Sequence, residues 1–312
     1  MKIILAAPRG FCAGVNMAIQ SLDLTLQKFG PPVYVYHEIV HNQFVVNEFK
    51  GKGAVFVNEI DEIPDGSTVL FSAHGVAPEI RNAAKSKNLH AFDATCPLVT
   101  KVHLEAIKYA KEGYTILLIG HEGHDEVIGT MGEAPEAIIL VEDEDAVQNL
   151  SIPDYAKLAY LTQTTLSVDD ANRIIDQLRK RFPDIESPPK EDICYATQNR
   201  QEAVRKLSEG VDAVIILGSQ NSSNSQRLRE LGAENGTPAY LADGPQDLDP
   251  RCFDKRQTIL ISAGASAPES VVQATIQWLE DNFEGELEER SVRKESVRFP
   301  LPKALRSIET KS

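Results

Sequence analysis

The sequence predicts an α/β fold made of three pseudo-symmetric βα lobes. Three times along the chain a cysteine is followed by a helix-like stretch that ends at a glycine 16 to 18 residues later. Each glycine precedes a short apolar run, which leads into a polar cluster. A supersecondary plan that recurs at similar spacing indicates an internal repeat, and apolar runs that alternate with helical patterns are typical of parallel sheets. We therefore expect three equivalent lobes in a trefoil arrangement.

The repeats also define the expected domains. The first lobe is expected over residues 12–95, the second over 96–193 and the third over 194–282, with the N-terminal strand 1–11 joined to the third. Residues 283–312 are highly charged, and we expect an irregular C-terminal tail. The lobes begin at Cys12, Cys96 and Cys194. Each lobe has two apolar runs, and a polar residue follows each run. After the first run these residues are His41, His124 and Asn224, and after the second they are His74, Thr164 and Ser266.

Composition narrows the class of protein. The chain has 312 residues and a net charge of -14, which argues against binding to a nucleic-acid backbone. No apolar run reaches the length of a membrane span, and the first ten residues resemble neither a signal peptide nor a transit peptide. Four scattered cysteines make no disulfide framework. We therefore expect a cytoplasmic protein with no membrane or nucleic-acid partner.

The first repeat opens with a strand and a glycine-rich turn. Gly10 and Gly14 flank Cys12 and let the backbone approach a bulky group closely. The next apolar run leads to His41, and the run VLFS ends just before His74. In open α/β sheets ligands bind beyond the carboxyl ends of the strands, so His74 is a candidate ligand-binding residue.

The second repeat places Cys96 where a strand is expected to turn into a helix. Pro97 suits the first helical position, Lys108 and Lys111 lie in the expected last turn, and Gly113 ends the element. A thiol at a helix N-terminus is favoured as thiolate, the form that binds metals or attacks electrophiles. A single cysteine is often only a small buried hydrophobe. The threefold recurrence is what favours a functional role.

A glycine-rich loop follows the strand TILLIG in this repeat and carries His121, Glu122, His124 and Glu126. Gly123 favours a loop over the helical HExxH zinc motif. A carboxylate two residues from a histidine at a strand end can deliver protons, which points to His124 and Glu126. The alternative for all four is a set of solvated loop residues.

Two hydroxyl-rich turns follow. The first contains Thr164, and part of it is expected to cap a helix, with Ser167 as the N-cap and Asp170 in the first turn. The second, LGSQNSSNS in the third repeat, contains Ser222, Ser223 and Asn224. Such a turn offers donors to a phosphate without positive charge, although Ser and Asn also serve simply as N-caps.

Three cysteines from separate segments fit poorly with a structural zinc site, which normally has closely paired ligands. They fit better with an iron-sulfur cluster on three thiolates, which leaves one iron open. The chain has no CxxC pair and no ferredoxin-type cysteine run. Cysteine spacing alone is therefore a weak signal.

Nine motifs over residues 1–282 nevertheless closely resemble those of the 4-hydroxy-3-methylbut-2-enyl diphosphate reductase family, which acts last in the methylerythritol phosphate route to isoprenoids. They are PRGFCAG, VHN, SAHG, DATCPLVTKVH, GHEGHDE, TQTTLSVDD, DICYATQNRQEAV, GSQNSSNS and AGASAP, in the order of the family. Cys252 and the tail lie outside the resemblance, and Cys252 is expected to be a non-ligand thiol.

The resemblance implies an oxidoreductase with three lobes around a central 4Fe-4S cluster. It implies cluster ligation by Cys12, Cys96 and Cys194, a position near the substrate hydroxyl for Thr164 and a proton-supplying role for Glu126. The allylic diphosphate substrate would be reduced to isopentenyl or dimethylallyl diphosphate. Because no GxGxxG fingerprint follows a strand, electrons are expected from a ferredoxin or flavodoxin. The residues implied to bind the diphosphate are His41, His74, His124, Ser222, Ser223, Asn224 and Ser266.

Two other functions are compatible with the residues themselves. A hydro-lyase can use an open iron as a Lewis acid without consuming electrons. A phosphate-binding module could close its lobes on a ligand while the cysteines only pack. The first requires no external electrons, and the second predicts a colourless protein.

Overall fold

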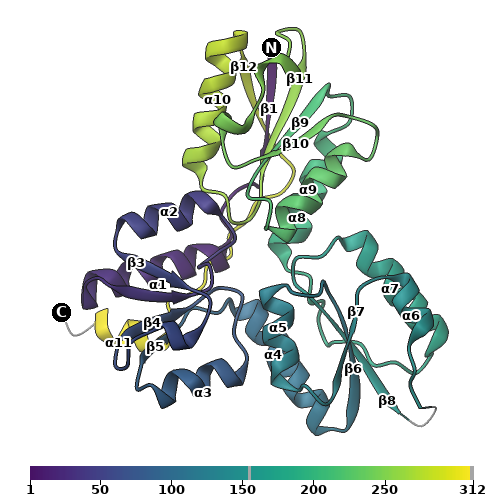
Figure 1. The fold of residues 1–312 in the computed structure, drawn as a ribbon. Helices are drawn as coiled ribbons and strands as arrows, with labels where there is room; N and C mark the ends of the chain where they lie inside the picture. The colour runs from purple at the N-terminus through teal and green to yellow at the C-terminus, as the bar shows by residue number, and fades with distance from the viewer. Residues whose placement is uncertain (154–155, 310–312) are drawn as a thin grey trace. The chain divides into compact units, whose positions relative to one another are not determined.

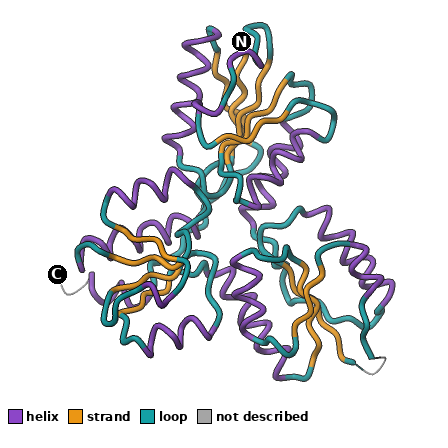
Figure 2. The backbone as a smooth tube through the Cα atoms, viewed as in Figure 1, coloured by secondary structure: helices purple, strands orange, loops and turns teal. Residues whose placement is uncertain are grey.

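The chain forms two compact units in the computed structural model, which describes residues 1–153 and 156–309 (Figure 1). Unit 1 consists of Met1–Asn16, Val40–Phe49 and Tyr195–Arg298, and unit 2 consists of Met17–Ile39, Lys50–Cys194 and Phe299–Ser312. Unit 1 contains one parallel sheet and unit 2 contains two, so the strands fall into three groups (Figure 2). The predicted α/β fold with three parallel sheets is confirmed, while the domain boundaries stay a prediction.

The sheet of unit 1 is covered by helices on both faces. Its order is β10-β9-β11-β1-β12, and every pair is parallel. Ile3 of β1 packs in one apolar cluster with α10, whereas the next residue, Ile4, packs in another with α8 and α9. Successive strand side chains point to opposite faces, so an uninterrupted apolar run is what a doubly covered sheet needs. The elements are β1 (Lys2–Ala7), α8 (Tyr195–Leu207), β9 (Ala213–Leu217), α9 (Ser223–Ala233), β10 (Ala239–Ala242), β11 (Thr258–Ala263), α10 (Glu269–Phe283) and β12 (Glu286–Ser291).

The irregular tail predicted after residue 283 is wrong in part. β12 (Glu286–Ser291) pairs with β1 along its whole length, and α11 (Lys303–Glu309) follows. The sequence ELEERS has no alternation of apolar and polar residues because five of its six side chains are exposed at the sheet edge. Backbone pairing with β1, rather than burial, holds this strand, and hydrophobic periodicity cannot detect such a strand.

The first sheet of unit 2 has the order β3-β2-β4-β5, again all parallel. Val69 and Phe71 of β4 share an apolar cluster with Ala84 of α3. The apolar run that follows the glycine of the first repeat, Gly30, forms β2. The elements are α1 (Ala13–Phe29), β2 (Val33–Tyr36), α2 (Gln43–Gly51), β3 (Ala54–Val57), β4 (Thr68–Phe71), α3 (Pro78–Ser86) and β5 (His90–Asp93); the α1 and α2 ranges each extend across a boundary between the units.

The second sheet of unit 2 has the order β7-β6-β8. Leu117 of β6 packs with α6 and α7 on one face, and Leu118 packs with α4 and α5 on the other (Figure 1). Pro97 begins α4, as its sequence predicts. The elements are α4 (Pro97–Lys111), β6 (Tyr114–Ile119), α5 (Asp125–Glu133), β7 (Ile138–Val141), α6 (Glu144–Asn149), β8 (Lys157–Thr162) and α7 (Val168–Arg181).

Among the described residues, no helix combines the length and apolarity needed to span a bilayer.

Candidate active site

The carboxyl ends of three adjacent strands carry the site candidates of unit 1. The chain that leaves β1 reaches Cys12, the chain that leaves β9 reaches Ser222, and the chain that leaves β11 reaches Ser266. Because the three strands are parallel neighbours, these segments emerge at the same edge of the sheet. The topology therefore gathers Cys12 with two serines that lie more than 200 residues later in the sequence.

Cys12 is held by the backbone of the turn after β11. Its N–H donates to the carbonyl of Ala265 at 3.1 Å, and the N–H of Gly10 donates to the carbonyl of Ala263 at 3.1 Å. The N–H of Val15, in the first turn of α1, donates to the Cys12 Sγ at 3.5 Å. The Cys12 sulfur therefore lies at a helix N-terminus and accepts a backbone N–H there, a position that suits a metal ligand.

Asn224 presents a buried amide that the protein does not use. The residue is 4% exposed, and neither its Oδ1 nor its Nδ2 has a hydrogen-bond partner among the described residues. A buried polar group without a partner costs free energy, so such a group indicates a missing ligand or water. The neighbouring Ser222 is the N-cap of α9 and accepts from the N–H of Ser225, as the capping alternative predicts.

Ser266 and His41 meet within unit 1. The hydroxyl of Ser266 donates to the His41 carbonyl at 2.9 Å, and Ser266 is 7% exposed. This contact links the turn after β11 to the segment that precedes α2. Two of the predicted diphosphate-binding residues are therefore neighbours in this unit.

In unit 2, Cys96 and Cys194 each lie at the start of a helix. Cys96 is the N-cap residue of α4, and its N–H donates to the carbonyl of Ala73 at 3.0 Å. Cys194 comes immediately before Tyr195, the first residue of α8, and its N–H donates to the carbonyl of Thr164 at 3.0 Å. Both thiols are half-buried.

Glu126 is a buried carboxyl bonded to Thr164. The Thr164 N–H donates to Oε1 at 2.6 Å, and the Thr164 hydroxyl donates to Oε2 at 2.9 Å. Burial raises the pKa of Glu126 to about 7, although both bonds from Thr164 oppose the rise. Such a carboxyl holds or releases a proton near neutral pH, which is the property of a general acid. Glu126 and Thr164, which the resemblance names separately as site residues, are therefore neighbours in this unit.

His124 and His74 face each other beside this carboxyl. Their rings are 6.1 Å apart, edge to face. His124 is the N-cap of α5, and its Nδ1 accepts from the N–H of Glu126 at 3.1 Å. Because Nδ1 is an acceptor, neutral His124 carries its proton on Nε2. The loop predicted for this segment is present up to His124, and the helix begins at Asp125.

The comparisons with known proteins agree with one another. The LytB protein family model matches residues 3–280. The chain belongs to the LytB family. Curated relatives named 4-hydroxy-3-methylbut-2-enyl diphosphate reductase include one from Rhodopirellula baltica, 72% identical over 99% of this chain and 97% of the relative, and one from Pseudomonas putida, 54% identical over 98% of each. The solved structure of the E-1-hydroxy-2-methyl-but-2-enyl-4-diphosphate reductase from Plasmodium falciparum is 40% identical, with a TM-score of 0.95 over 99% of this chain and 98% of that one. A second reductase structure, titled as the terminal enzyme of the non-mevalonate pathway, is 31% identical, with a TM-score of 0.63 over 90% of this chain and 100% of that one.

Two ion pairs in this LytB family member were not predicted from its sequence. Lys101 Nζ lies 2.6 Å from Asp192 Oδ1, and the Asp192 side chain is 0% exposed. The other Asp192 oxygen accepts from the N–H of Thr162 at 2.9 Å. Lys101 lies on α4, one turn after Cys96, whereas Asp192 comes two residues before Cys194. The pair therefore ties together the two segments that carry these cysteines.

The second pair joins His37 Nδ1 to Asp125 Oδ1 at 2.7 Å. The hydrogen bond with Asp125 raises the pKa of His37, against the effect of burial. Asp125 Oδ2 also lies 3.7 Å from His74 Nδ1. Lys101, Asp125 and Asp192 lie inside the motifs of this LytB family member, whereas His37 lies outside them. The sequence does not show which charges pair, because the partners come from distant segments.

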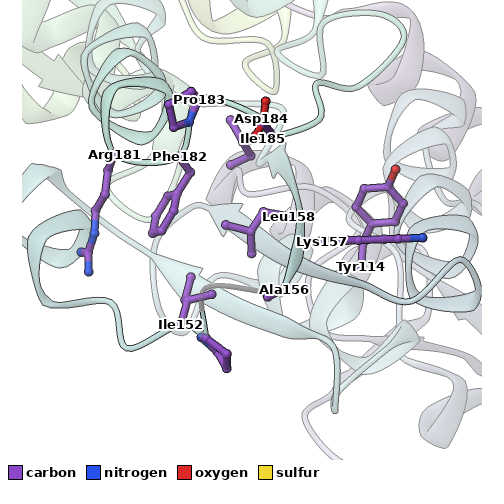
Figure 3. Close-up of a pocket in the computed structure, with 11 residues that line it drawn as sticks. Tyr114, Ile152, Ala156, Lys157, Leu158, Arg181, Phe182, Pro183, Asp184 and Ile185 are labelled. Atoms are coloured by element: carbon purple, nitrogen blue, oxygen red, sulfur yellow. The ribbon is translucent and has the colours of Figure 1, made fainter.

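The remaining polar candidates lie elsewhere. His121 is half-buried and Glu122 is exposed in the loop after β6. Cys252 is an exposed free thiol. A pocket of about 600 Å³ in unit 2 is lined by residues such as Leu158, Phe182 and Ile185, and none of the predicted site residues lines it (Figure 3).

Proposed function

We propose that this chain reduces 4-hydroxy-3-methylbut-2-enyl diphosphate to isopentenyl diphosphate and dimethylallyl diphosphate, the last step of the methylerythritol phosphate pathway. The observation that carries the proposal is the buried Glu126 carboxyl, whose pKa is about 7. It is bonded to Thr164, whose carbonyl in turn holds the backbone of Cys194. The names of the relatives support the same reaction.

We propose Cys12, Cys96 and Cys194 as ligands of a 4Fe-4S cluster. The residues fit this group because all three thiols are half-buried and each lies at or just before the start of a helix. When bound, such a cluster supplies a Lewis acid for the substrate hydroxyl and a path for electrons. The electrons would come from a ferredoxin or flavodoxin, and a reducing cytoplasm would keep the thiols available.

The reaction consumes two electrons and two protons, breaks the C–O bond of the allylic alcohol and releases water. Glu126, whose pKa of about 7 lets it hold a proton near neutral pH, would donate that proton to this chemistry, and the Thr164 hydroxyl would orient the substrate hydroxyl. The unpartnered Asn224 amide would bind a diphosphate oxygen through Nδ2. The proposed diphosphate-binding residues are His41, His74, His124, Ser222, Ser223, Asn224 and Ser266.

Anaerobic purification tests the proposal. We expect a brown protein with about four irons and four sulfides per chain at full occupancy. With a reduced one-electron donor, it should convert the substrate to the two diphosphate products and consume two electrons per turnover. A colourless protein that binds the diphosphate indicates a binding module, and turnover without electron consumption indicates a hydro-lyase. Either result would overturn the proposal.

A further inference from the structure

Arg200 is a buried cation at the centre of unit 1. The residue is 0% exposed and is the largest of the fully buried side chains described. Arginine is almost never fully buried unless it is paired, because removing its charge from water is costly. Arg200 lies on α8, the helix that begins immediately after Cys194. Its contacts therefore require an explanation beyond packing.

The guanidinium binds the turn that precedes Cys12. Nε donates to the carbonyl of Gly10 at 3.1 Å, and Nη2 donates to the same oxygen at 2.7 Å. Nη1 donates to the carbonyl of Ala196 at 2.9 Å, within α8 itself. A rigid planar fork that bonds one carbonyl twice fixes both the distance and the orientation of its acceptor. The Gly10 peptide is therefore fixed relative to α8.

Gly10 has little freedom to move away. Its φ of +63° lies in the left-handed region, and a Cβ at this position would lie 3.2 Å from the Ala267 carbonyl. Cys12, two residues later, is bonded on the other side to Ala265. The turn is therefore held between the chain after β11 and the guanidinium on α8. The placement of the Cys12 thiol depends on both.

Glu295 supplies the counter-charge. Its Oε1 lies 3.0 Å from Arg200 Nη1 and also accepts from Asn199 Nδ2 at 3.0 Å, and its side chain is 17% exposed. Glu295 comes from the segment after β12, which the sequence predicts to be part of an irregular tail. Truncating one partner of a buried ion pair leaves the other charge uncompensated. This C-terminal segment therefore stabilises the guanidinium in its position.

We propose that Glu295 and Arg200 are positioning residues for Cys12: the C-terminal segment fixes the guanidinium, and the guanidinium fixes the turn that presents the thiol. The role assigned to the thiol rests on the proposed function, but the position of the turn does not. Neither residue is proposed to touch the substrate.

Hydrogen exchange of the full-length chain, prepared without iron, tests the position of the turn. In Glu295→Ala we expect the peptide that covers residues 9–16 to exchange about tenfold faster, because a charge-assisted bond that resists local opening is lost. Peptides around Cys96 and Cys194 should exchange as in the wild type. The matched control is Glu288→Ala, because Glu288 is an exposed carboxylate of β12 that pairs with Lys2 and Arg290. An unchanged 9–16 peptide, or equal acceleration of all peptides, would overturn the proposal.

Iron retention tests the consequence for the thiol. After anaerobic reconstitution, Glu295→Ala should release iron to a chelator faster than the wild type and the control. Arg200→Lys is the second variant, to be used if Glu295→Ala fails to fold. It keeps the positive charge but loses the pair of hydrogen bonds to the Gly10 carbonyl, so both hydrogen exchange of residues 9–16 and iron release should become faster. Faster hydrogen exchange of residues 9–16 with an unchanged rate of iron release would refute the claim that Glu295 and Arg200 position the Cys12 thiol. A wild type that binds no iron would refute the proposed function. The hydrogen-exchange result would still show whether Glu295 and Arg200 hold the turn that precedes Cys12.

Discussion

Replacing Glu126 by Gln removes the ionisable proton of this side chain but keeps its size and shape. Gln has the same size and still accepts from the Thr164 N–H, so the fold should be kept. The pKa of Glu126 is raised from 4.5 to about 7, which corresponds to about 3 kcal/mol at 1.36 kcal/mol per pH unit. The folded state holds this proton more tightly than the unfolded state. Its contribution to the free energy of unfolding is therefore complete below pH 4.5 and is lost as the pH rises through about 7. The Gln variant lacks this dependence.

We therefore expect the Gln variant to gain stability relative to the wild type by about 3 kcal/mol between pH 4.5 and pH 8. Urea unfolding of both proteins, without iron, over this range measures the difference. Turnover of the reconstituted variant should fall about 10² to 10⁴-fold with iron content unchanged, since general acid catalysis contributes that much. The control is Glu122→Gln, an exposed carboxylate in the loop that precedes α5. A pH-independent stability difference, or unchanged turnover, would refute the role of the buried proton.

Three further predictions concern single side chains. Lys101→Met should lower the free energy of unfolding by about 3 to 5 kcal/mol in urea titrations, because it leaves the buried Asp192 carboxylate unpaired; a loss below about 1 kcal/mol would contradict this. Cys252→Ser should leave iron content unchanged in a colorimetric iron assay, because the thiol is exposed and outside the proposed ligands, and iron loss would show that the ligand set is wrong. Ser167→Ala should cost about 1 kcal/mol in thermal unfolding, because its hydroxyl accepts from the Asp170 N–H at the start of α7, whereas Ser167→Asp should restore the cap.

Local signals in the sequence predicted local structure well. Pro97 marks the start of α4, Ser167 caps α7, and the strand at Val33–Tyr36 has the bounds of its apolar run. Each of these features is decided by neighbouring residues, through backbone geometry or a hydrogen bond within one turn. The recurrence of these units was enough to predict three parallel sheets.

Contacts between distant segments could not be predicted in the same way. Glu126 reads as a loop residue of an acidic stretch, and only the tertiary structure buries it against Thr164. Arg200 occupies a helix position where a solvated cation would be ordinary, yet it is fully buried. The pKa of a carboxyl and the partner of a guanidinium depend on burial, and neither leaves a periodic pattern. The spacing of His124 and Glu126, together with the family resemblance, predicted the role of Glu126, but nothing predicted that of Arg200.

The strand β12 also hinders the pairing of this sheet with a strand of another molecule. Without β12, the apolar strand β1 would be the open margin of its sheet, with a row of free peptide groups able to recruit a strand from another molecule. β12 occupies that margin and presents Glu286, Glu288, Glu289 and Arg290 to solvent instead. Such a charged border repels further strand addition. The glutamates of β12 thus favour a monodisperse protein over fibrous aggregation.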